Sequence, residues 1–488
     1  MALGRSPDEP GFNMTSLALR FAGFVNGVSR RHAEVSCGLL RSACPHLAVE
    51  EMPIRSVTNG VHLSAWTSPE IARLLSTGGE PVTGADFSRA SAVDLDALWD
   101  ARSRVRARLV ARVAAHLRRS FDERRDSPAL LEATLAALSP DAMFIGFARR
   151  FAAYKRADLV LRDPGRLREI LCGQGKPVRL LVAGKAHPRD HAAKEMLAKV
   201  ARVARSDEFV GRLIVLENYD MALARTLVQG VDVWLNNPRP PLEASGTSGM
   251  KAAANGALNL SVGDGWWLEA YSGENGWVIG DERPAGDDAV QDEIDAASLY
   301  RLLEEEVVPL FFRRDARGAP RDWLDRVRRS LATIPPVFDS GRMVAEYRDL
   351  AYAPLAARFD ELRADGYASL RAAAAARSRL AAGIAAARIV RIVAGETATV
   401  GQATAVQVDV DLGVLAAEEV LVEFVAGRRA GDELSGVAVV ALTAEPAQAV
   451  GVRRFSGSFT PSEPGSLGYL VRVRPRGPVS LHGPAVWA

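Results

Sequence analysis

Five short apolar runs between residues 141 and 262 constrain the fold more than any other feature of the chain. They are MFIGFA, VRLLVAG, RLIVLE, VDVWLNN and GALNLSV, and helical or turn segments separate them. Strands that alternate with helices at this spacing form parallel βαβ units, so the pattern predicts a doubly wound α/β sheet with helices on both faces. Ligands bind such sheets beyond the carboxyl ends of the strands. The segments FARR, AGKAHP, LENYD and NNPRPPLEASGTSG are all expected at that edge.

Helical patterns flank the predicted sheet, and a β-rich pattern follows them. Helical spacing covers NMTSLALRFAGFV near the start, and residues 67–138 are Arg-rich and helical, without a strand pattern. Residues 290–384 are helical again and end in an Ala-rich run from Pro354 to about Ile384, with an apolar side formed by Leu370, Leu380 and Ile384. After Arg388 apolar residues recur with period two, which is typical of antiparallel strands and predicts a small β-sandwich.

The segment DLDALWDARSRVRARLVARVAAHLRRSFDERRD predicts one long amphipathic helix. Its arginines are diluted by Ala, Asp and Glu, and its apolar residues recur on one side. We therefore expect the arginines on a solvated face, opposite an apolar stripe. The stripe consists of Leu95, Leu98, Val105, Leu109, Val113 and Leu117.

Composition argues against several classes of protein. The chain is 48% hydrophobic and 25% charged, and its net charge of +2 provides no basic field for a nucleic acid or an anionic membrane. Cys37, Cys44 and Cys172 are too few and too irregularly spaced for a disulfide framework or a zinc site. There is no signal-peptide core at the start and no apolar stretch of about 18 residues. We expect a cytoplasmic protein without a metal site.

One lysine stands out in EASGTSGMKAAANGAL, residues 243–258. The chain has only six lysines against 55 arginines, and Lys251 is one of the six. Arginine stays protonated, whereas a partly buried lysine can lose its proton and form an imine, so Lys251 is a candidate for covalent chemistry. The Gly-rich turn before it offers backbone N–H groups to an anion, although a purely structural helix cap is the alternative. It is not a Walker A loop, because Ala252 stands where magnesium would need Ser or Thr.

A second candidate anion site follows the first predicted strand. In FARRFAAYKRADL, four cations lie within eight residues: Arg149, Arg150, Lys155 and Arg156. Cations are unfavourable at a helix N-terminus unless an anion joins them, so the cluster suits one or two phosphates. A solvated helix start is the alternative.

Three further groups leave alternatives open. Glu243 could cap a helix or hydrogen-bond a ligand hydroxyl, and Tyr219 could belong to the core or to a pocket wall. Trp266 and Trp267 are expected in the core, with stacking on a sugar as the alternative. Two anion sites, an imine-forming lysine and a polar loop together suggest a phosphorylated aldehyde cofactor beside a second phosphate. Pyridoxal phosphate with inorganic phosphate fits that description.

The sequence resembles the α-glucan phosphorylases in their shorter bacterial form. The matching stretches, in family order between about residues 12 and 280, are NGVSRRHAEVS, TNGVHLSAW, GFARRFAAYKRADL, LVAGKAHPRDHAAK, LENYDMALA and LEASGTSGMKAAANGAL. The combination of EASGT, GMK and NGAL is highly specific. The resemblance implies a GT-B architecture of two Rossmann-like domains and pyridoxal 5'-phosphate as cofactor. It also implies a catalytic activity. The activity is retaining phosphorolysis of an α-1,4-glucan, glycogen or maltodextrin, by inorganic phosphate to glucose 1-phosphate.

The resemblance also implies roles for individual residues around the cofactor. Lys251 would form the Schiff base with pyridoxal phosphate, and Tyr219 would line its pocket. Five residues would surround the cofactor phosphate: Arg149, Lys155, Gly246, Thr247 and Ser248. The longer animal-type enzymes have lysine where this chain has Arg149, and Gly-Asn where it has Ser248-Gly249. Both changes keep a charge or backbone donors, so the expected roles stand.

On the substrate side, the resemblance implies that Arg150 and Lys155 hold the reacting phosphate and are catalytic. The glucosyl 3- and 4-hydroxyls would be bound by Glu243, Ser245 and Gly246, and the 6-hydroxyl by Asn59.

The family carries several hundred residues before FNMTSLALR, so the chain resembles the C-terminal portion of a phosphorylase, with the first domain largely missing. The expected segments are a remnant of the first Rossmann-like domain (1–66), a helical connector (67–139), a second Rossmann-like domain for cofactor and phosphate (140–340), a helical return segment (341–386) and the β-sandwich (387–488). The remnant would expose an apolar helix face at residues 13–29, formed by Leu17, Leu19, Phe21, Phe24 and Val25. The sequence leaves open whether an N-terminal half is present on a separate chain and whether the protein forms a homodimer.

Two other functions are possible at this stage. A nucleotide-sugar glycosyltransferase of the GT-B fold needs no imine lysine, so Lys251 and GTSGMK argue against it. A cofactor- or glucan-binding fragment that is inactive without its N-terminal half cannot be separated from an active phosphorylase by the sequence.

Overall fold

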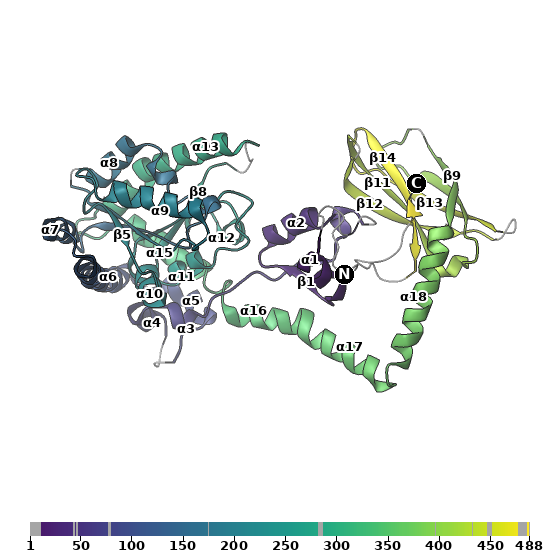
Figure 1. Ribbon diagram of the computed structural model, residues 1–488, viewed down its shortest axis with the longest axis horizontal. Coiled ribbons are helices and arrows are strands. Elements are labelled where there is room, and N and C mark those ends of the chain that lie inside the picture. The colour runs from purple at the N-terminus through teal and green to yellow at the C-terminus, as the bar shows by residue number, and fades with distance from the viewer. Residues whose placement is uncertain are drawn as a thin grey trace. The chain divides into compact units, whose positions relative to one another are not determined.

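The chain folds into two compact units, each of which combines segments that are distant in sequence. The computed structural model describes residues 11–487 except 42–43, 45–46, 77–79, 174, 282–285, 396, 432, 447–450 and 477–485. We call Gly27–Ala33 with Ser56–Arg348 the sheet unit, and Met1–Asn26 with Glu34–Arg55 and Asp349–Ala488 the terminal unit. The first ten residues of the predicted 1–66 segment lie outside the described residues. Figure 1 labels the elements of both units.

A six-stranded parallel sheet forms the centre of the sheet unit, in the order β5-β4-β3-β6-β7-β8. Five strands are the five predicted runs, which confirms the doubly wound α/β prediction, and β8 was not predicted. The strands are β3 (Met143–Ala148), β4 (Val178–Ala183), β5 (Leu213–Leu216), β6 (Val233–Asn236), β7 (Leu258–Val262) and β8 (Gly276–Ile279).

Helices cover both faces of this sheet (Figure 1). Alternate residues of β3 enter different cores, because Ile145 and Phe147 pack in one apolar cluster and Phe144 packs in the other. The two cores are therefore separated by the sheet, as period-two side-chain alternation requires. The longer helices of the unit are α6 (Leu95–Arg124), α7 (Pro128–Ala136), α8 (Pro164–Cys172), α9 (His191–Ala204), α10 (Met221–Gly230), α13 (Asp288–Arg301), α15 (Arg321–Thr333) and α16 (Ser340–Tyr347).

Two arginines of α6 are buried, which corrects the prediction that this helix turns its arginines to solvent. The apolar stripe is confirmed, except that Leu95 is only partly buried. Arg102 and Arg106 are 2% and 3% exposed, and both contact Asp232, which directly precedes β6. Arg106 Nη2 lies 3.0 Å from Asp232 Oδ1, and Asp232 Oδ2 accepts the N–H of Phe144 at 3.0 Å. The sequence pattern missed them because a buried arginine needs a distant acceptor that periodicity does not reveal.

The N-terminal helix of the terminal unit is shorter than predicted. Helix α1 spans Met14–Phe21, and residues Val25–Gly27 form strand β1, which pairs with β2 (Ile54–Ser56). The expected apolar face is also wrong in part, because Leu19 is 5% exposed and only Phe21, at 71%, is strongly exposed. The chain leaves the helix near Gly23, where a Cβ atom would stand 2.6 Å from a methyl carbon of Leu355.

The C-terminal part of the terminal unit consists of two helices and an antiparallel sheet. The Ala-rich run is divided into α17 (Ala353–Ala364) and α18 (Ala368–Ala386), because Gly366 and Tyr367 have φ of +64° and +66°. Of its predicted apolar side, Ile384 is buried and Leu370 is 44% exposed. The strands are β9 (Arg388–Ala394), β10 (Thr404–Asp411), β11 (Val420–Ala430), β12 (Glu433–Ala444), β13 (Val452–Phe459), β14 (Leu467–Pro475) and β15 (Val486–Trp487).

These seven strands are hydrogen-bonded in one order, β15-β14-β11-β12-β13-β10-β9. The end of β12 joins the two halves, since Thr443 and Ala444 pair with β13 while the rest of β12 pairs with β11. Alternate residues of β10 and β11, such as Val408 and Val422, pack in the same core although these strands are not neighbours. The sheet therefore folds over one core, as the two layers of a sandwich do.

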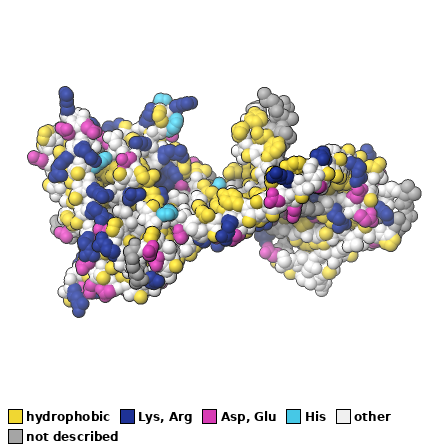
Figure 2. All heavy atoms as spheres, turned by 90° about the horizontal axis from the view of Figure 1, so that it is seen from below, with side chains coloured by type: hydrophobic (Ala, Val, Ile, Leu, Met, Phe, Trp, Pro, Cys, Tyr) yellow, Lys and Arg dark blue, Asp and Glu magenta, His cyan; other side chains and the backbone are white. Residues whose placement is uncertain are grey.

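The surface carries mixed charge. In the view of Figure 2, Lys and Arg side chains are interspersed with Asp and Glu rather than gathered on one face. Within the described residues, no helix is both long and apolar enough to cross a membrane.

The buried charges around Asp232 make a prediction about stability. Replacing Asp232 by Ala leaves Arg102 and Arg106 buried without their carboxylate, so we expect a loss of about 3–5 kcal/mol in the free energy of unfolding. Asp322→Ala is the matched control, because its pair with Arg313 is exposed and is expected to contribute under about 1 kcal/mol. Urea unfolding of both variants measures the difference. Equal effects would contradict the assignment.

Candidate functional site

The predicted ligand-binding segments meet at the carboxyl edge of the parallel sheet. The N–H of Arg149, directly after β3, donates to the carbonyl of Ala183 at the end of β4. The N–H of Arg239, after β6, donates to the carbonyl of Tyr154 at 2.7 Å. These bonds tie FARR, AGKAHP and NNPRP together, as expected from parallel strands that end at a common edge.

A buried ion-pair cluster occupies this edge. Arg149 Nη2 lies 2.7 Å from Glu243 Oε2, and the Lys155 amine contacts the same carboxylate oxygen. The Lys155 amine also lies 4.5 Å from the centre of the Tyr154 ring. The side chain of Arg149 is 9% exposed, and burial lowers its pKa although Glu243 opposes the effect. Its Nε and Nη1 atoms are buried without a hydrogen-bond partner among the described residues, so they are available to an anion.

The other two cations of FARRFAAYKRADL do not join this cluster. Arg156 is 3% exposed and binds Asp295 Oδ2 at 2.6 Å and Asp292 Oδ1 at 2.9 Å. It also donates from Nε to the carbonyl of Asn237 at 3.0 Å, so it is a structural residue and not part of a four-cation anion site. Arg150 is exposed to solvent at the end of β3.

Lys251 lies on the short helix α11 (Ser248–Ala253) against an indole ring. Its amine nitrogen is 3.9 Å from the centre of the Trp66 ring, and burial lowers the pKa of the amine. Lys155 and Lys251 are the only two of the six lysines that are not exposed. A half-buried amine with a lowered pKa is more readily neutral, which is the state that attacks an aldehyde.

The turn before Lys251 has a backbone that needs glycine. Gly246 has φ of +88°, and a Cβ on Gly249 would lie 2.4 Å from Asn259 Oδ1. The hydroxyl of Ser248 accepts a hydrogen bond from Trp234 Nε1 at 3.2 Å. Among the described residues, the backbone N–H groups of Gly246, Thr247 and Ser248 have no acceptor. The turn therefore leaves successive donors unused.

The remaining predicted residues lie around this turn. Ser245 is 6% exposed and its hydroxyl has no partner among the described residues. Tyr219 follows β5 and is partly buried, and the charge of Arg149 opposes the rise that burial causes in its pKa. Asn59 is half-buried, and its N–H donates to the carbonyl of Val28 at 3.0 Å. Trp266 and Trp267 are 1% and 0% exposed, which confirms the core alternative.

Three neighbours of the site were not predicted: Trp66 against Lys251, Tyr154 beside Lys155, and Asp264. Asp264 is 2% exposed and accepts the N–H of Glu243 at 2.9 Å. Burial, with a smaller contribution from the nearby Glu243 carboxylate, raises its pKa to about 6 against two backbone hydrogen bonds that lower it. Local patterns could not find Trp66, which lies far from Lys251 in sequence. The only feature of the sequence that could have drawn attention to Asp264 is its place between two glycines, directly before two tryptophans.

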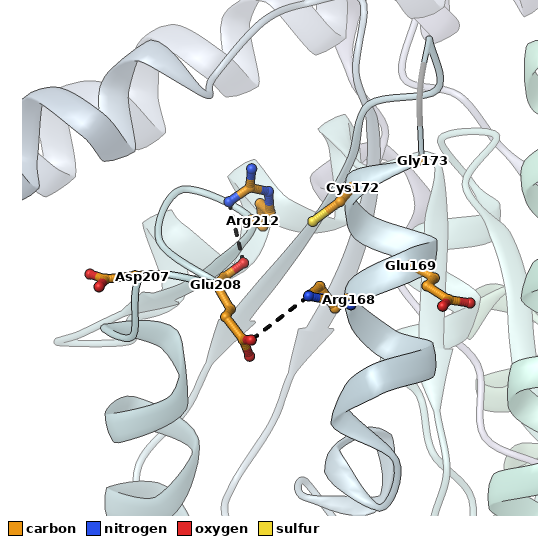
Figure 3. A pocket seen from close by; sticks show the side chains of 7 residues that line it. All are labelled: Arg168, Glu169, Cys172, Gly173, Asp207, Glu208 and Arg212. Atoms are coloured by element: carbon orange, nitrogen blue, oxygen red, sulfur yellow. Dashed lines mark hydrogen bonds and ion pairs between the residues drawn. The ribbon is translucent and has the colours of Figure 1, made fainter.

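The pocket drawn in Figure 3 lies at the opposite edge of the sheet. It has a volume of about 570 Å³. It is formed by the end of α8, which precedes β4, and by residues between 207 and 212, which precede β5. Arg168 Nη1 is 3.9 Å from Glu208 Oε1 across it, and both side chains are more than half exposed. The amino edge is not where doubly wound sheets bind ligands, so this pocket is not the candidate site. No group of three metal-ligating side chains occurs in the described part of the chain.

Comparisons with known proteins identify the family that the chain resembles. Residues 3–302 match the family described as Carbohydrate phosphorylase, and residues 386–485 match the Glycogen phosphorylase C-terminal domain. The chain is 39% identical over 490 residues to glycogen phosphorylase of Mycobacterium tuberculosis, covering 98% of this chain and 56% of the relative. It is 40% identical over 435 residues to maltodextrin phosphorylase of Thermococcus litoralis, covering 88% of this chain and 50% of the relative. The chain thus spans about half the length of these relatives.

Asp264 gives a pH-dependent prediction. Its pKa is raised from 3.8 to about 6 in the folded state, so protonation favours folding, and this contribution is lost as pH rises through about 6. Asp264→Asn cannot ionise. We expect its free energy of unfolding to improve relative to the natural chain by about 1.4 kcal/mol between pH 5 and pH 8. Urea unfolding at both pH values measures this, and a difference that does not change with pH would contradict the raised pKa.

Proposed function

The chain belongs to the carbohydrate phosphorylase family, and from this premise we propose that it carries the cofactor and phosphate sites of an α-1,4-glucan phosphorylase. The proposed reaction is phosphorolysis of glycogen or maltodextrin by inorganic phosphate, with retention, to give glucose 1-phosphate. The observation that carries the proposal is the half-buried amine of Lys251, whose pKa burial lowers, on the short helix that follows the loop of Glu243, the partner of Arg149 and Lys155.

The residues present suit pyridoxal 5'-phosphate. Lys251 supplies an amine for the cofactor aldehyde, and Tyr219 supplies a partly buried aromatic wall. For the cofactor phosphate, the chain offers the unpartnered Nε and Nη1 of Arg149 together with Lys155. The unused N–H groups of Gly246, Thr247 and Ser248 add uncharged donors. A buried guanidinium with two idle nitrogens is costly unless an anion uses it, which supports the assignment.

Arg150 and Lys155 are proposed to hold the substrate phosphate and to stabilise its charge during the reaction. Arg150 is exposed, so its fork is free to bind two phosphate oxygens. Lys155 is buried against Glu243 and provides a fixed charge that needs no reorganisation. When bound, pyridoxal phosphate would supply a phosphate group able to exchange a proton with the substrate phosphate.

The glucosyl unit is proposed to lie against Glu243, Ser245, Gly246 and Asn59. The hydroxyl of Ser245 is buried without a partner, so a sugar hydroxyl would satisfy it. Glu243 is held by Arg149 and Lys155, which fixes its carboxylate while leaving further lone pairs for a ligand hydroxyl. These four residues would orient the sugar, and the bound sugar itself would exclude water from the site.

The proposal also covers the polypeptides that the active enzyme would need. A GT-B enzyme places its site between two Rossmann-like domains, and the sheet unit supplies one of them. Because the chain spans about half of its relatives, we propose that glucan turnover needs a complementary N-terminal polypeptide, in the same or a separate chain, in the cytoplasm. A homodimer is compatible with the proposal.

Lys251 is predicted to be the only site of covalent cofactor attachment. After incubation with pyridoxal phosphate and borohydride reduction, the peptide that contains TSGMK should gain the mass of the reduced cofactor. Lys251→Arg should abolish the label and the absorbance of the bound cofactor, because arginine does not form an imine. Lys194→Arg, at an exposed lysine, should leave both unchanged. Label on another lysine would contradict the assignment.

Arg150 is predicted to act through the substrate phosphate. In the active assembly, Arg150→Ala should lower turnover at least about 10²-fold, as for removal of one charge-stabilising donor. Arg150→Lys should recover only part of the loss, because lysine cannot bind phosphate in bidentate fashion. Arg168→Ala, at the opposite edge of the sheet, is the matched control. Unchanged phosphate dependence in Arg150→Ala would refute the role.

The chain without the complementary polypeptide is predicted to bind the cofactor but to phosphorolyse glycogen and maltodextrin feebly or not at all. Catalysis needs sugar and phosphate held together, and the described part of this chain offers one wall. Adding the N-terminal polypeptide should restore release of glucose 1-phosphate. Robust phosphorolysis by the 488-residue chain alone would overturn this part of the proposal.

A further inference from the structure

The segment Asp264–Glu269 contacts both regions that carry the proposed glucosyl contacts, yet none of its residues has a role in the proposed function. One region is the loop Glu243–Gly246. The other is the pair Thr58-Asn59 with the neighbouring residues 27–33. All of these segments belong to the sheet unit.

Three hydrogen bonds fix the backbone of the loop. The N–H of Glu243 donates to Asp264 Oδ2 at 2.9 Å, and the carbonyl of Ser245 accepts the N–H of Trp266 at 3.0 Å. The carbonyl of Ala244 accepts the hydroxyl of Ser29 at 2.7 Å. Three successive residues are therefore held through their main chain, which leaves the side chains of Glu243 and Ser245 for a ligand.

Gly265 allows this contact between the two segments. Its φ is +55°, and a Cβ atom there would lie 2.5 Å from the carbonyl oxygen of Ser245. Any other residue would push the loop away. The close approach is thus set by the sequence DG at this point.

Glu269 fixes the second region. Its two carboxylate oxygens lie 3.0 and 2.9 Å from the hydroxyl of Thr58, and one of them accepts the N–H of Arg30 at 2.9 Å. Its side chain is 11% exposed. Thr58 directly precedes Asn59, and the N–H of Asn59 donates to the carbonyl of Val28 at 3.0 Å. Glu269 thus holds Asn59 from both sides, through Thr58 and through the 27–33 segment.

The 27–33 segment also binds the loop Glu243–Gly246. Ser29, which binds Ala244, stands between Val28, which binds Asn59, and Arg30, which binds Glu269. A single carboxylate therefore sets where both the Asn59 side and the Ala244 side of the proposed sugar site lie.

We propose that Glu269 is a positioning residue that fixes the spacing between Asn59 and the loop Glu243–Gly246, and so the fit of the glucosyl unit. This inference rests on the proposed function for its ligand. Glu269 itself binds no sugar, because its oxygens are used by Thr58 and Arg30.

Glu269→Gln tests the proposal, because glutamine keeps the shape but only one of its two terminal atoms accepts hydrogen bonds. Thr58→Val removes the partner hydroxyl at nearly constant volume, and Thr58→Ser keeps it. Glu274→Gln is the matched control, since Glu274 is 67% exposed and pairs only with the exposed Arg329 among the described residues. Each variant is measured for hydrogen–deuterium exchange of the chain and for glucose 1-phosphate KM and kcat in the active assembly.

Glu269→Gln and Thr58→Val should each raise amide exchange in the peptides spanning 27–33, 56–61 and 243–247, and should raise the KM for glucose 1-phosphate about tenfold. Absorbance of the bound cofactor should stay unchanged. The double variant should be no worse than Glu269→Gln alone, because both substitutions act on the contact between Thr58 and Glu269. Thr58→Ser and Glu274→Gln should behave like the natural chain.

Other outcomes overturn the proposal. Unchanged exchange would show that Glu269 does not hold these segments. Raised exchange with an unchanged KM would show that it holds them without affecting the sugar. If the natural assembly fails to turn over glucose 1-phosphate while the exchange pattern appears as expected, the proposed function fails and the substrate role of Glu269 falls with it, although the structural connection stands.

Discussion

The carboxylate of Asp232 is the interaction on which the sheet unit depends. It is buried directly before the central strand β6, where it forms ion pairs with Arg102 and Arg106 of α6 and accepts the N–H of Phe144 in β3. One group thus fixes the long helix, the strand pairing and the start of β6. Because β6 is only four residues long, the same group also sets where the loop to Glu243 leaves the sheet. The two guanidinium groups share this one carboxylate, and Arg102 also donates to the carbonyls of Gln229, Asn255 and Val231.

At the carboxyl edge of the sheet, by contrast, several buried polar atoms have no hydrogen-bond partner in the described part of the chain. Arg149 Nε and Nη1, Ser245 Oγ and the side-chain oxygens of Asn236 and Asn237 are buried without hydrogen bonds in the described part of the chain. Native proteins leave few such atoms, and each needs an explanation. Their concentration at the carboxyl edge, together with the shared Glu243 carboxylate, matches a site that gains its missing partners from a ligand. The two ends of β6 therefore differ: ion pairs hold its start, and the proposed ligand site lies beyond its end.

The sequence predicted the features that depend on local patterns. Five of the six strands of the parallel sheet, the antiparallel C-terminal strands and the stripe of α6 all follow from period-two or helical spacing. The β8 run GWVI was missed because it is short and follows a Gly/Ser-rich stretch. Arg102, Arg156 and Asp264 could not be predicted, because their burial depends on partners more than 20 residues away. The roles of Lys251, Glu243 and Asn59 came from family resemblance, and the structure supplies their surroundings.

The two lysines that are not exposed have different surroundings. Lys155 is paired with the Glu243 carboxylate, which also binds Arg149, so its amine is held beside a second cation. Lys251 has no carboxylate partner in the described part of the chain and lies on the face of Trp66. The indole attracts a cation, whereas burial lowers the pKa of Lys251, so the two surroundings act on the amine in opposite directions. Arginine could replace the first lysine in charge but could not replace the second, because a guanidinium does not become a neutral nucleophile. The surroundings of the two amines therefore fit the proposed division between an electrostatic role for Lys155 and a covalent role for Lys251.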